Sequence, residues 1–270
     1  MSVRELYPGN KRHSLKGLYL KLALHRIAAA RNVYIYANYI VSLDGRISLP
    51  MGTDAMQRVP DSLANARDWR LYQELAAQSE VLITSARYFR QLAQGCAQDV
   101  LPLGDPARFT DLQEWRAAQG LRAQPDVLIL SNSLNIPPDA LPCDRRVLVA
   151  CGRDASEAAA ARLRGEGVAL YRCPQGKVDG GFVRQLLITH GYRSAYMIAG
   201  PEVHRTLLEA GVLDECFLTL RHMLLGGRSY ATCLEGPLAQ PVAMELVSLY
   251  LDDDIDPAQQ FARFRLRKHG

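Results

Sequence analysis

The second half of the chain alternates helix-like and strand-like segments at a regular pitch. Three segments with helical spacing of apolar residues, ASEAAAARLRGEG, GGFVRQLLITHG and PEVHRTLLEAG, are each followed by an apolar run, VALYR, SAYMIAG and ECFLTLRHML. Strands that are joined by helices run parallel, because the helix brings the chain back to the same end of the sheet. We therefore expect parallel strands with helices on the faces of the sheet.

Strands are also predicted near both ends of the sequence. The run from Tyr34 to Val41, a helix capped by Asp61 or Ser62, and the short run Val81–Ile83 form a β-α-β beginning. At the other end, AMELVSLYLD and QFARFRLRK have no helix between them and are expected to be antiparallel edge strands. The predicted fold class is therefore α/β, with three layers and a mixed, mostly parallel sheet that ends in antiparallel C-terminal strands.

The chain of 270 residues and 30.0 kDa can hold one large domain. Because the amino-acid composition shows no change that would mark a second domain, we predict a single domain over 32–270. A basic amphipathic helix over 1–31 is predicted to precede it. Residues 1–31 carry seven Lys or Arg against the single acid Glu5. This segment has two interpretations. It could be a patch that binds anions or nucleic acid, or it could be a helix that docks on its own domain or on a dimer partner. We favour docking, because basic helix faces are usually just solvated.

Composition and missing motifs exclude several function classes. The formal net charge of +4 argues against general polyanion binding, and neither the six cysteines nor the six histidines show metal-ligand spacing. We therefore expect no metal, reduced thiols and a soluble, cytoplasmic protein with no membrane span. The motifs G-x-x-x-x-G-K-[ST], G-x-G-x-x-G, G-x-S-x-G and H-x-E with P-C-x-x-C are absent from the sequence, which removes support for several nucleotide-binding, hydrolase and deaminase classes.

Three predicted strands end in polar or glycine residues. Ser42-Leu43-Asp44-Gly45-Arg46 closes the first, Thr84-Ser85 the second, and Gly200-Pro201 opens a helix after the third. Carboxyl ends of parallel strands form the ligand crevice of open α/β sheets, and a helix start favours an anion. A strand-Gly-Pro-helix junction is also a common connection without any ligand, so this pattern alone leaves both interpretations open.

The ordered motifs resemble a known family. NYIVSLDGRISL, ARDWRLYQELAAQSEVLITSARYF and MIAGPEVHRTLLEAGVLDECFLTLRHMLLGG follow one another as in the reductase domain of the bifunctional riboflavin-biosynthesis deaminase/reductase and its stand-alone relatives, which have the dihydrofolate reductase fold. The resemblance spans Tyr34 to Gly227. It implies NADPH as cofactor, a homodimer, and reduction of the ribosylamino group of a pyrimidine 5'-phosphate to a ribitylamino group.

The resemblance also implies roles for individual residues. Asp44 matches the catalytic acidic position beside substrate and nicotinamide, with Ser42 and Gly45 in the substrate site. Arg87 is the nearest cation to the expected 2'-phosphate pocket, although a solvated helix residue is the alternative. The other matching cofactor positions are Thr84, Ser85, Gly200, Pro201, Glu202, Val203 and the pair Gly226-Gly227.

Two departures from the family pattern keep other functions open. Ile198 stands where the family usually has an acid before Gly-Pro, and the deaminase half is absent. The leading hypothesis is an NADPH-dependent reductase of a pyrimidine or related heterocycle, and the second is a ligand-binding homologue without turnover. A nucleic-acid-associated protein ranks last, because the sequence lacks the interleaved aromatic and basic residues that stack bases.

Overall fold

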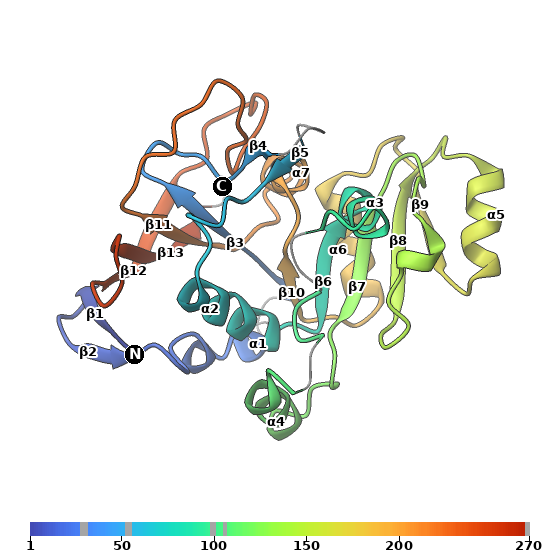
Figure 1. Ribbon diagram of the computed structural model, residues 1–270. Coiled ribbons are helices and arrows are strands. Elements are labelled where there is room, and N and C mark those ends of the chain that lie inside the picture. Colours follow the sequence, from blue (N-terminus) through green and yellow to red (C-terminus); the bar gives the residue numbers. More distant parts are fainter. Residues whose placement is uncertain (28–31, 52–55, 98–100, 105–106, 268–270) are drawn as a thin grey trace.

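The computed structural model describes residues 1–27, 32–51, 56–97, 101–104 and 107–267. Strands and helices alternate along most of this part of the chain (Figure 1). The strands are β1 (Ser2–Tyr7), β2 (Arg12–Ser14), β3 (Tyr34–Ser42), β4 (Leu49–Met51), β5 (Met56–Arg58), β6 (Val81–Ser85), β7 (Asp126–Leu130), β8 (Val147–Gly152), β9 (Ala169–Cys173), β10 (Ser194–Met197), β11 (Glu215–Arg221), β12 (Met244–Asp252) and β13 (Gln259–Leu266). The helices are α1 (Leu24–Ile27), α2 (Ala66–Ala77), α3 (Ala86–Ala93), α4 (Thr110–Ala118), α5 (Glu157–Gly165), α6 (Gly180–Thr189) and α7 (Pro201–Glu209), with 3₁₀ turns η1 (Leu20–Leu22) and η3 (Pro138–Ala140).

One mixed sheet organises the described residues. Its strand order is β2-β1-β12-β13-β11-β3-β10-β6-β7-β8-β9, and every neighbouring pair from β11 to β9 is parallel. Strand β10 lies between β3 and β6, with Met197 opposite Ala37 of β3 and Ile83 of β6. The predicted mixed, mostly parallel sheet is confirmed.

Helices cover both faces of the sheet, which explains why its central strands are apolar along their whole length. Helices α2, α3, α4 and α5 contribute Leu71, Phe89, Leu112 and Leu163 to the buried core on one face. Helices α6 and α7 pack on the other face, where Leu187 is buried. The three layers in Figure 1 follow from this arrangement.

The C-terminal strands are antiparallel, as predicted, but the prediction that they are edges is wrong. Strand β13 lies between β11 and β12, and β12 pairs on its other side with β1. One arginine of β13 is paired inside the sheet: the Arg263 guanidinium donates to both carboxylate oxygens of the fully buried Glu215 at 2.8 Å. The edge on this side is the short strand β2.

The predicted N-terminal helix over 1–31 is also wrong. Its first residues form the β1–β2 hairpin, and only the turn η1 and the short helix α1 follow within the described residues 1–27. Pairing with β12 outweighs the helical spacing, because it satisfies backbone groups and buries Val3 completely. The division into 1–31 and 32–270 stays a prediction, while β1 is part of the common sheet.

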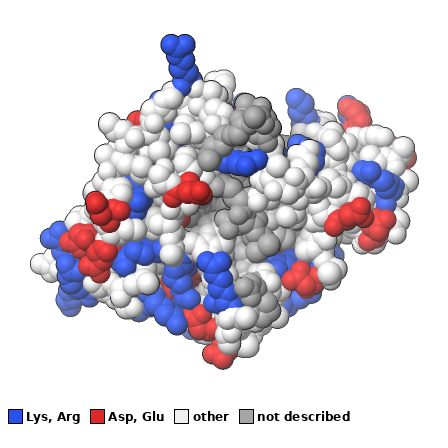
Figure 2. Space-filling view, in the orientation of Figure 1, with Lys and Arg blue, Asp and Glu red and all other residues white. Residues whose placement is uncertain are grey.

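Opposite charges neutralise one another around the hairpin. Arg4 and Arg12 lie 3.7 and 3.5 Å from Asp253, and Lys16 lies 3.1 Å from Asp111. Figure 2 accordingly shows blue and red side chains intermixed on this side of the molecule. This pairing favours the interpretation that the basic segment packs on its own domain. No helix in the described residues is long and apolar enough to cross a membrane.

Candidate functional site

Three neighbouring parallel strands end at the same edge of the sheet. Strand β3 ends at Ser42, β6 at Ser85 and β10 at Met197, with β10 between the other two. The convergence predicted from the sequence is therefore confirmed. Two cavities of similar size, about 330 and about 320 Å³, open here, and Gly200 lines both.

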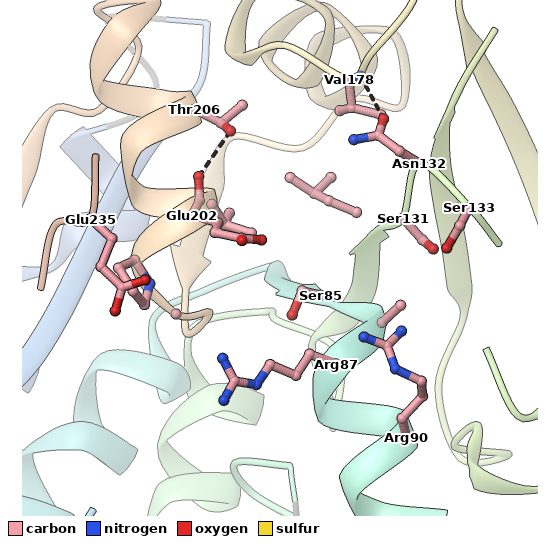
Figure 3. Close-up of a pocket in the computed structure, with 15 residues that line it drawn as sticks. Ser85, Arg87, Arg90, Ser131, Asn132, Ser133, Val178, Glu202, Thr206 and Glu235 are labelled. Atoms are coloured by element: carbon pink, nitrogen blue, oxygen red, sulfur yellow. Dashed lines mark hydrogen bonds between the residues drawn. The ribbon is translucent and has the colours of Figure 1, made fainter. Parts of the chain in front are cut away.

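The first cavity lies between α3, α7 and the loop after β7. Figure 3 shows Arg87 and Arg90 of α3 on one side, with Asn132 from the β7 loop and Glu202 of α7 across from them. The Asn132 side-chain oxygen accepts a hydrogen bond from the Val178 amide at 2.9 Å, which ties two loops together at the rim. The remaining lining residues are Ser85, Ala86, Leu130, Ser131, Ser133, Gly200, Pro201, Val203, Thr206 and Glu235.

Gly200 keeps the space between the two cavities open. Its backbone is extended (φ −73°, ψ −176°), so any residue could adopt this conformation. A Cβ atom built on Gly200 would meet no heavy atom within 4 Å, and its side chain would enter the open space. Pro201 begins α7 directly afterwards, and no side chain caps the first amides of this helix. These amides are therefore available to an anion.

The structure brings most of the predicted cofactor residues together. Six of them line the first cavity: Ser85, Arg87, Gly200, Pro201, Glu202 and Val203. Thr84 is buried in β6, and Gly227 lies in the loop after β11, where its carbonyl accepts a hydrogen bond from Arg46 at 3.1 Å. Sequence reasoning missed Arg90 and the Ser131-Asn132-Ser133 run, although the polar residues after DVLIL repeat the signal used for the other strand ends.

Asp44 fastens the end of β3 to the loop after β11. Its carboxylate accepts hydrogen bonds from the amides of Gly226 at 2.9 Å and Leu225 at 3.3 Å, and also from Ser42 and Arg46. Gly45 allows the tight turn that this requires, because its φ is +80°. Asp44 does not appear among the described residues that line the two cavities, and its catalytic role stays a prediction.

The hydrogen bonds to Asp44 also fix its protonation state. The Ser42 hydroxyl and the Gly226 amide are the main causes that lower the pKa of Asp44 to about 2. A carboxylate with this pKa is ionised at neutral pH. Asp44 can therefore accept hydrogen bonds there, but it is not a proton donor.

The second cavity has aromatic walls. Trp69 and Tyr72 of α2 stack with their rings 4.9 Å apart and 12° from parallel, and Tyr88 of α3 also lines the space. Ile198, at the position where the family usually has an acid, lies in the same wall. Flat apolar walls of this kind suit a planar heterocycle.

One carboxyl group lines this aromatic cavity. Asp68 follows the N-cap Asn65 of α2, whose side-chain oxygen accepts the Asp68 amide at 3.0 Å. Burial raises the pKa of Asp68 to about 6, against the opposing effects of a hydrogen bond from Thr219 and the charge of Arg221. Sequence reasoning treated Asp68 only as a helix residue, because no local motif marks it.

A protein-family comparison assigns the chain. The model of the RibD C-terminal domain matches residues 33–254. This protein belongs to the RibD C-terminal domain family. The resemblance found in the sequence is thereby confirmed, and membership of this family supports a reductase. No curated protein matches the chain.

Solved structures share the fold of this family member. A pyrimidine reductase-like protein from Corynebacterium diphtheriae has a TM-score of 0.65 at 17% identity, covering 90% of this chain and 95% of that chain. RibD from Acinetobacter baumannii has a TM-score of 0.61 at 19% identity, covering 89% of this chain and 60% of that chain. The riboflavin biosynthesis reductase Rib7 from Saccharomyces cerevisiae has a TM-score of 0.57 at 15% identity, covering 93% and 99%. At these identities the likeness concerns the fold alone.

Proposed function

We propose that this protein is an NADPH-dependent reductase of a pyrimidine-type heterocycle, similar to 5-amino-6-(5-phosphoribosylamino)uracil reductase of riboflavin biosynthesis. The observation that carries the proposal is the pair of cavities that meet at Gly200, one lined by cations and hydroxyls and the other by aromatic rings. Hydride transfer from a nicotinamide to the ribosylamino carbon needs the cofactor and the substrate in direct contact, and two cavities with a shared wall allow this.

The first cavity fits the cofactor. The uncapped start of α7 suits a pyrophosphate, and Arg87 with Arg90 suits a further phosphate on the ribose. Hydroxyls of Ser131 and Ser133 add hydrogen-bonding groups for a sugar-phosphate. When bound, the reduced nicotinamide supplies the hydride.

The second cavity fits the substrate. The stacked rings of Trp69 and Tyr72 hold a planar ring in place and exclude water from it. The protein's contribution to the reaction is therefore orientation of the substrate beside Gly200 in an apolar space. Asp44 then fixes the rim of the site by holding the loop after β11.

Ile198 is the specific observation that favours a second candidate function. An apolar side chain lines the substrate cavity at the position where the family pattern usually has an acid, and it removes a polar contact. A ligand-binding homologue that has lost turnover would retain both cavities. Binding without any NADPH oxidation would support this alternative.

The test is to measure NADPH and NADH binding by calorimetry and then NADPH oxidation against a panel of compounds. The panel contains the ribosylaminopyrimidine phosphate, its ribosylaminouracil counterpart and dihydrofolate. We expect tighter binding of NADPH than NADH and turnover of a pyrimidine. Failure of both cofactors to bind at millimolar concentration would overturn the reductase proposal.

Assembly and location are further parts of this proposal. We propose a cytoplasmic homodimer, with apolar surface near the C-terminal part of the sheet at the interface. Met244 at the start of β12 is 44% exposed and belongs to this surface. Light scattering that gives the monomer mass in dilute solution would contradict the dimer.

A further inference from the structure

The sheet stops positioning the chain just before the wall that the two cavities share. Strand β10 ends at Met197, and the Ile198 amide still donates a hydrogen bond to the backbone of β6 at 2.9 Å. The next amide, that of Ala199, donates to the sulfur atom of Met197 at 3.2 Å, and a thioether is a weak acceptor. The peptide between Ala199 and Gly200 therefore takes its orientation from a contact outside the sheet ladder.

The side chain of Tyr39 makes this contact. Its hydroxyl, on β3, donates a hydrogen bond to the Ala199 carbonyl oxygen at 3.2 Å. Among the residues that the structure describes, this carbonyl has no other hydrogen-bond donor. Tyr39 is 7% exposed, and burial raises the pKa of its hydroxyl well above the usual value. The hydroxyl therefore keeps its hydrogen and remains a donor.

Helix α7 holds Tyr39 in place. The Tyr39 ring lies against that of His204, with the ring centroids 5.0 Å apart and the planes 38° from parallel. The Nδ1 atom of His204 is 2.7 Å from the Cys233 carbonyl oxygen, and it carries the hydrogen because a carbonyl only accepts. Burial lowers the pKa of His204, which keeps this ring neutral at pH 7. Tyr39, α7 and the loop after β11 therefore pack as one unit.

The hydrogen bond from Tyr39 fixes the direction of the Gly200 amide. The peptide between Ala199 and Gly200 is trans, so its N–H points opposite to its C=O. Gly200 is exposed and lines both cavities, and within the described residues its amide has no hydrogen-bond partner. Because the carbonyl is turned toward the buried Tyr39, the amide is turned toward the exposed side of Gly200.

Without this hydrogen bond the peptide could turn over. The reversed peptide would give Gly200 a positive φ, which glycine tolerates. It would also place the Ala199 carbonyl oxygen where the Gly200 amide now lies, beside the uncapped start of α7. A carbonyl oxygen there opposes a phosphate, because both groups only accept hydrogen bonds.

We propose that Tyr39 is a positioning residue, which holds this peptide so that the Gly200 amide joins the first amides of α7 in binding the cofactor's pyrophosphate. This inference rests on the proposed function, because it names a residue that prepares the cofactor cavity for its ligand. Tyr39 acts through the peptide, since its hydroxyl donates to Ala199. NADPH and NADH share the pyrophosphate, so both depend on Tyr39, in contrast to the role proposed for Arg87.

The test removes the hydroxyl and keeps the ring. Tyr39→Phe should bind NADPH and NADH each at least about tenfold more weakly than the wild type in calorimetry, because a charge-assisted hydrogen bond to the pyrophosphate is lost. The ratio of the two affinities should not change, because the 2'-phosphate is not affected. A crystal structure of the variant should show the peptide between Ala199 and Gly200 turned over or in two orientations.

The matched control is Tyr36→Phe. Tyr36 lies on the same strand, is fully buried, and its hydroxyl also donates to a backbone carbonyl, that of Leu75, at 2.8 Å. It is not among the described residues that line the two cavities. Urea denaturation should show a loss of stability for both variants, whereas only Tyr39→Phe should weaken cofactor binding.

A second measurement leaves Tyr39 unchanged. In the NMR spectrum of protein labelled with ¹⁵N-glycine, the Gly200 amide is identified by its absence from the spectrum of Gly200→Ala. Its proton resonance should move downfield when NADPH is added to the wild type, as expected for an amide that donates to a phosphate. An unshifted resonance at saturating NADPH overturns the inference.

The remaining outcomes separate this inference from the reductase proposal. Wild-type affinity of Tyr39→Phe for both cofactors overturns the inference and leaves the reductase proposal standing. The same holds if Tyr36→Phe weakens both cofactors equally, or if Tyr39→Phe weakens NADPH alone. A wild-type protein that binds neither cofactor at millimolar concentration overturns the reductase proposal and this inference with it.

Discussion

Asp68→Asn should make the protein more stable at alkaline pH. Burial raises the pKa of Asp68 from 3.8 to about 6. A group with a raised folded-state pKa contributes stability at low pH that is lost as pH rises through the folded value. The shift of about two units, at 1.36 kcal/mol per unit, corresponds to about 3 kcal/mol lost by pH 8. Because the Asp68 residue is only 8% exposed, solvent screening does not reduce this figure much.

The assay is urea denaturation of the wild type and of Asp68→Asn at pH 8 and at pH 5. Removing the charge should raise the free energy of unfolding by about 3 kcal/mol at pH 8 and by about half of that at pH 5, where part of the wild-type carboxyl is protonated. The control Asp139→Asn, the same change at an exposed position in η3, should show no such difference. A variant that is less stable than the wild type by the same amount at both pH values would refute the reasoning, because it would mean that the carboxylate is satisfied in the folded protein.

Three further predictions concern residues at the ends of β3, β6 and β10. Gly200→Val should fold normally, because the backbone conformation at this position suits any residue, but it should weaken NADPH binding at least about tenfold by filling open space. The NADPH affinity of Gly200→Ala should lie between those of the wild type and Gly200→Val. Unchanged NADPH affinity in calorimetry would contradict the cofactor site. Asp44→Asn should keep NADPH affinity while lowering turnover by about a hundredfold or more, and full activity would show that Asp44 only shapes the turn. Arg87→Ala should weaken NADPH about tenfold and leave NADH unchanged, whereas an equal loss for both cofactors would place Arg87 outside the 2'-phosphate pocket.

The order of helices and strands was accessible from the sequence because it depends on local patterns. Apolar runs such as Val81–Ile83 and amphipathic helices are recognised from short stretches of sequence. The exact helix start is not: the predicted cap Asp61 or Ser62 is wrong, because Asn65 caps α2. Right-handed, parallel connections then bring the ends of β3, β6 and β10 to one edge without further information. Six of the predicted cofactor residues lie together for this reason.

The features that escaped prediction depend on contacts between distant segments. Strand β1 pairs with β12, so that Arg4 lies opposite Leu251, and nothing within the first 31 residues indicates this partner. The burial of Asp68 depends on β11, about 150 residues later in the chain, which brings Thr219 and Arg221 beside α2. The sequence places Asp68 near a helix start, where acidic residues are common. The burial of its carboxylate could therefore not be predicted from the local sequence.

The two carboxylates of this region differ in how fully they are hydrogen-bonded, and this difference separates their functions. Asp44 accepts bonds from two backbone amides and two side chains, so its pKa falls to about 2 and the loop after β11 uses most of its capacity. Asp68 keeps an oxygen without a partner among the described residues and has a pKa raised to about 6. Replacement of Asp68 by a neutral residue is therefore expected to stabilise the folded protein at neutral and alkaline pH. Asp44 therefore holds the loop after β11 against the end of β3, whereas Asp68 lies in the wall of the second cavity with one carboxylate oxygen unpaired among the described residues.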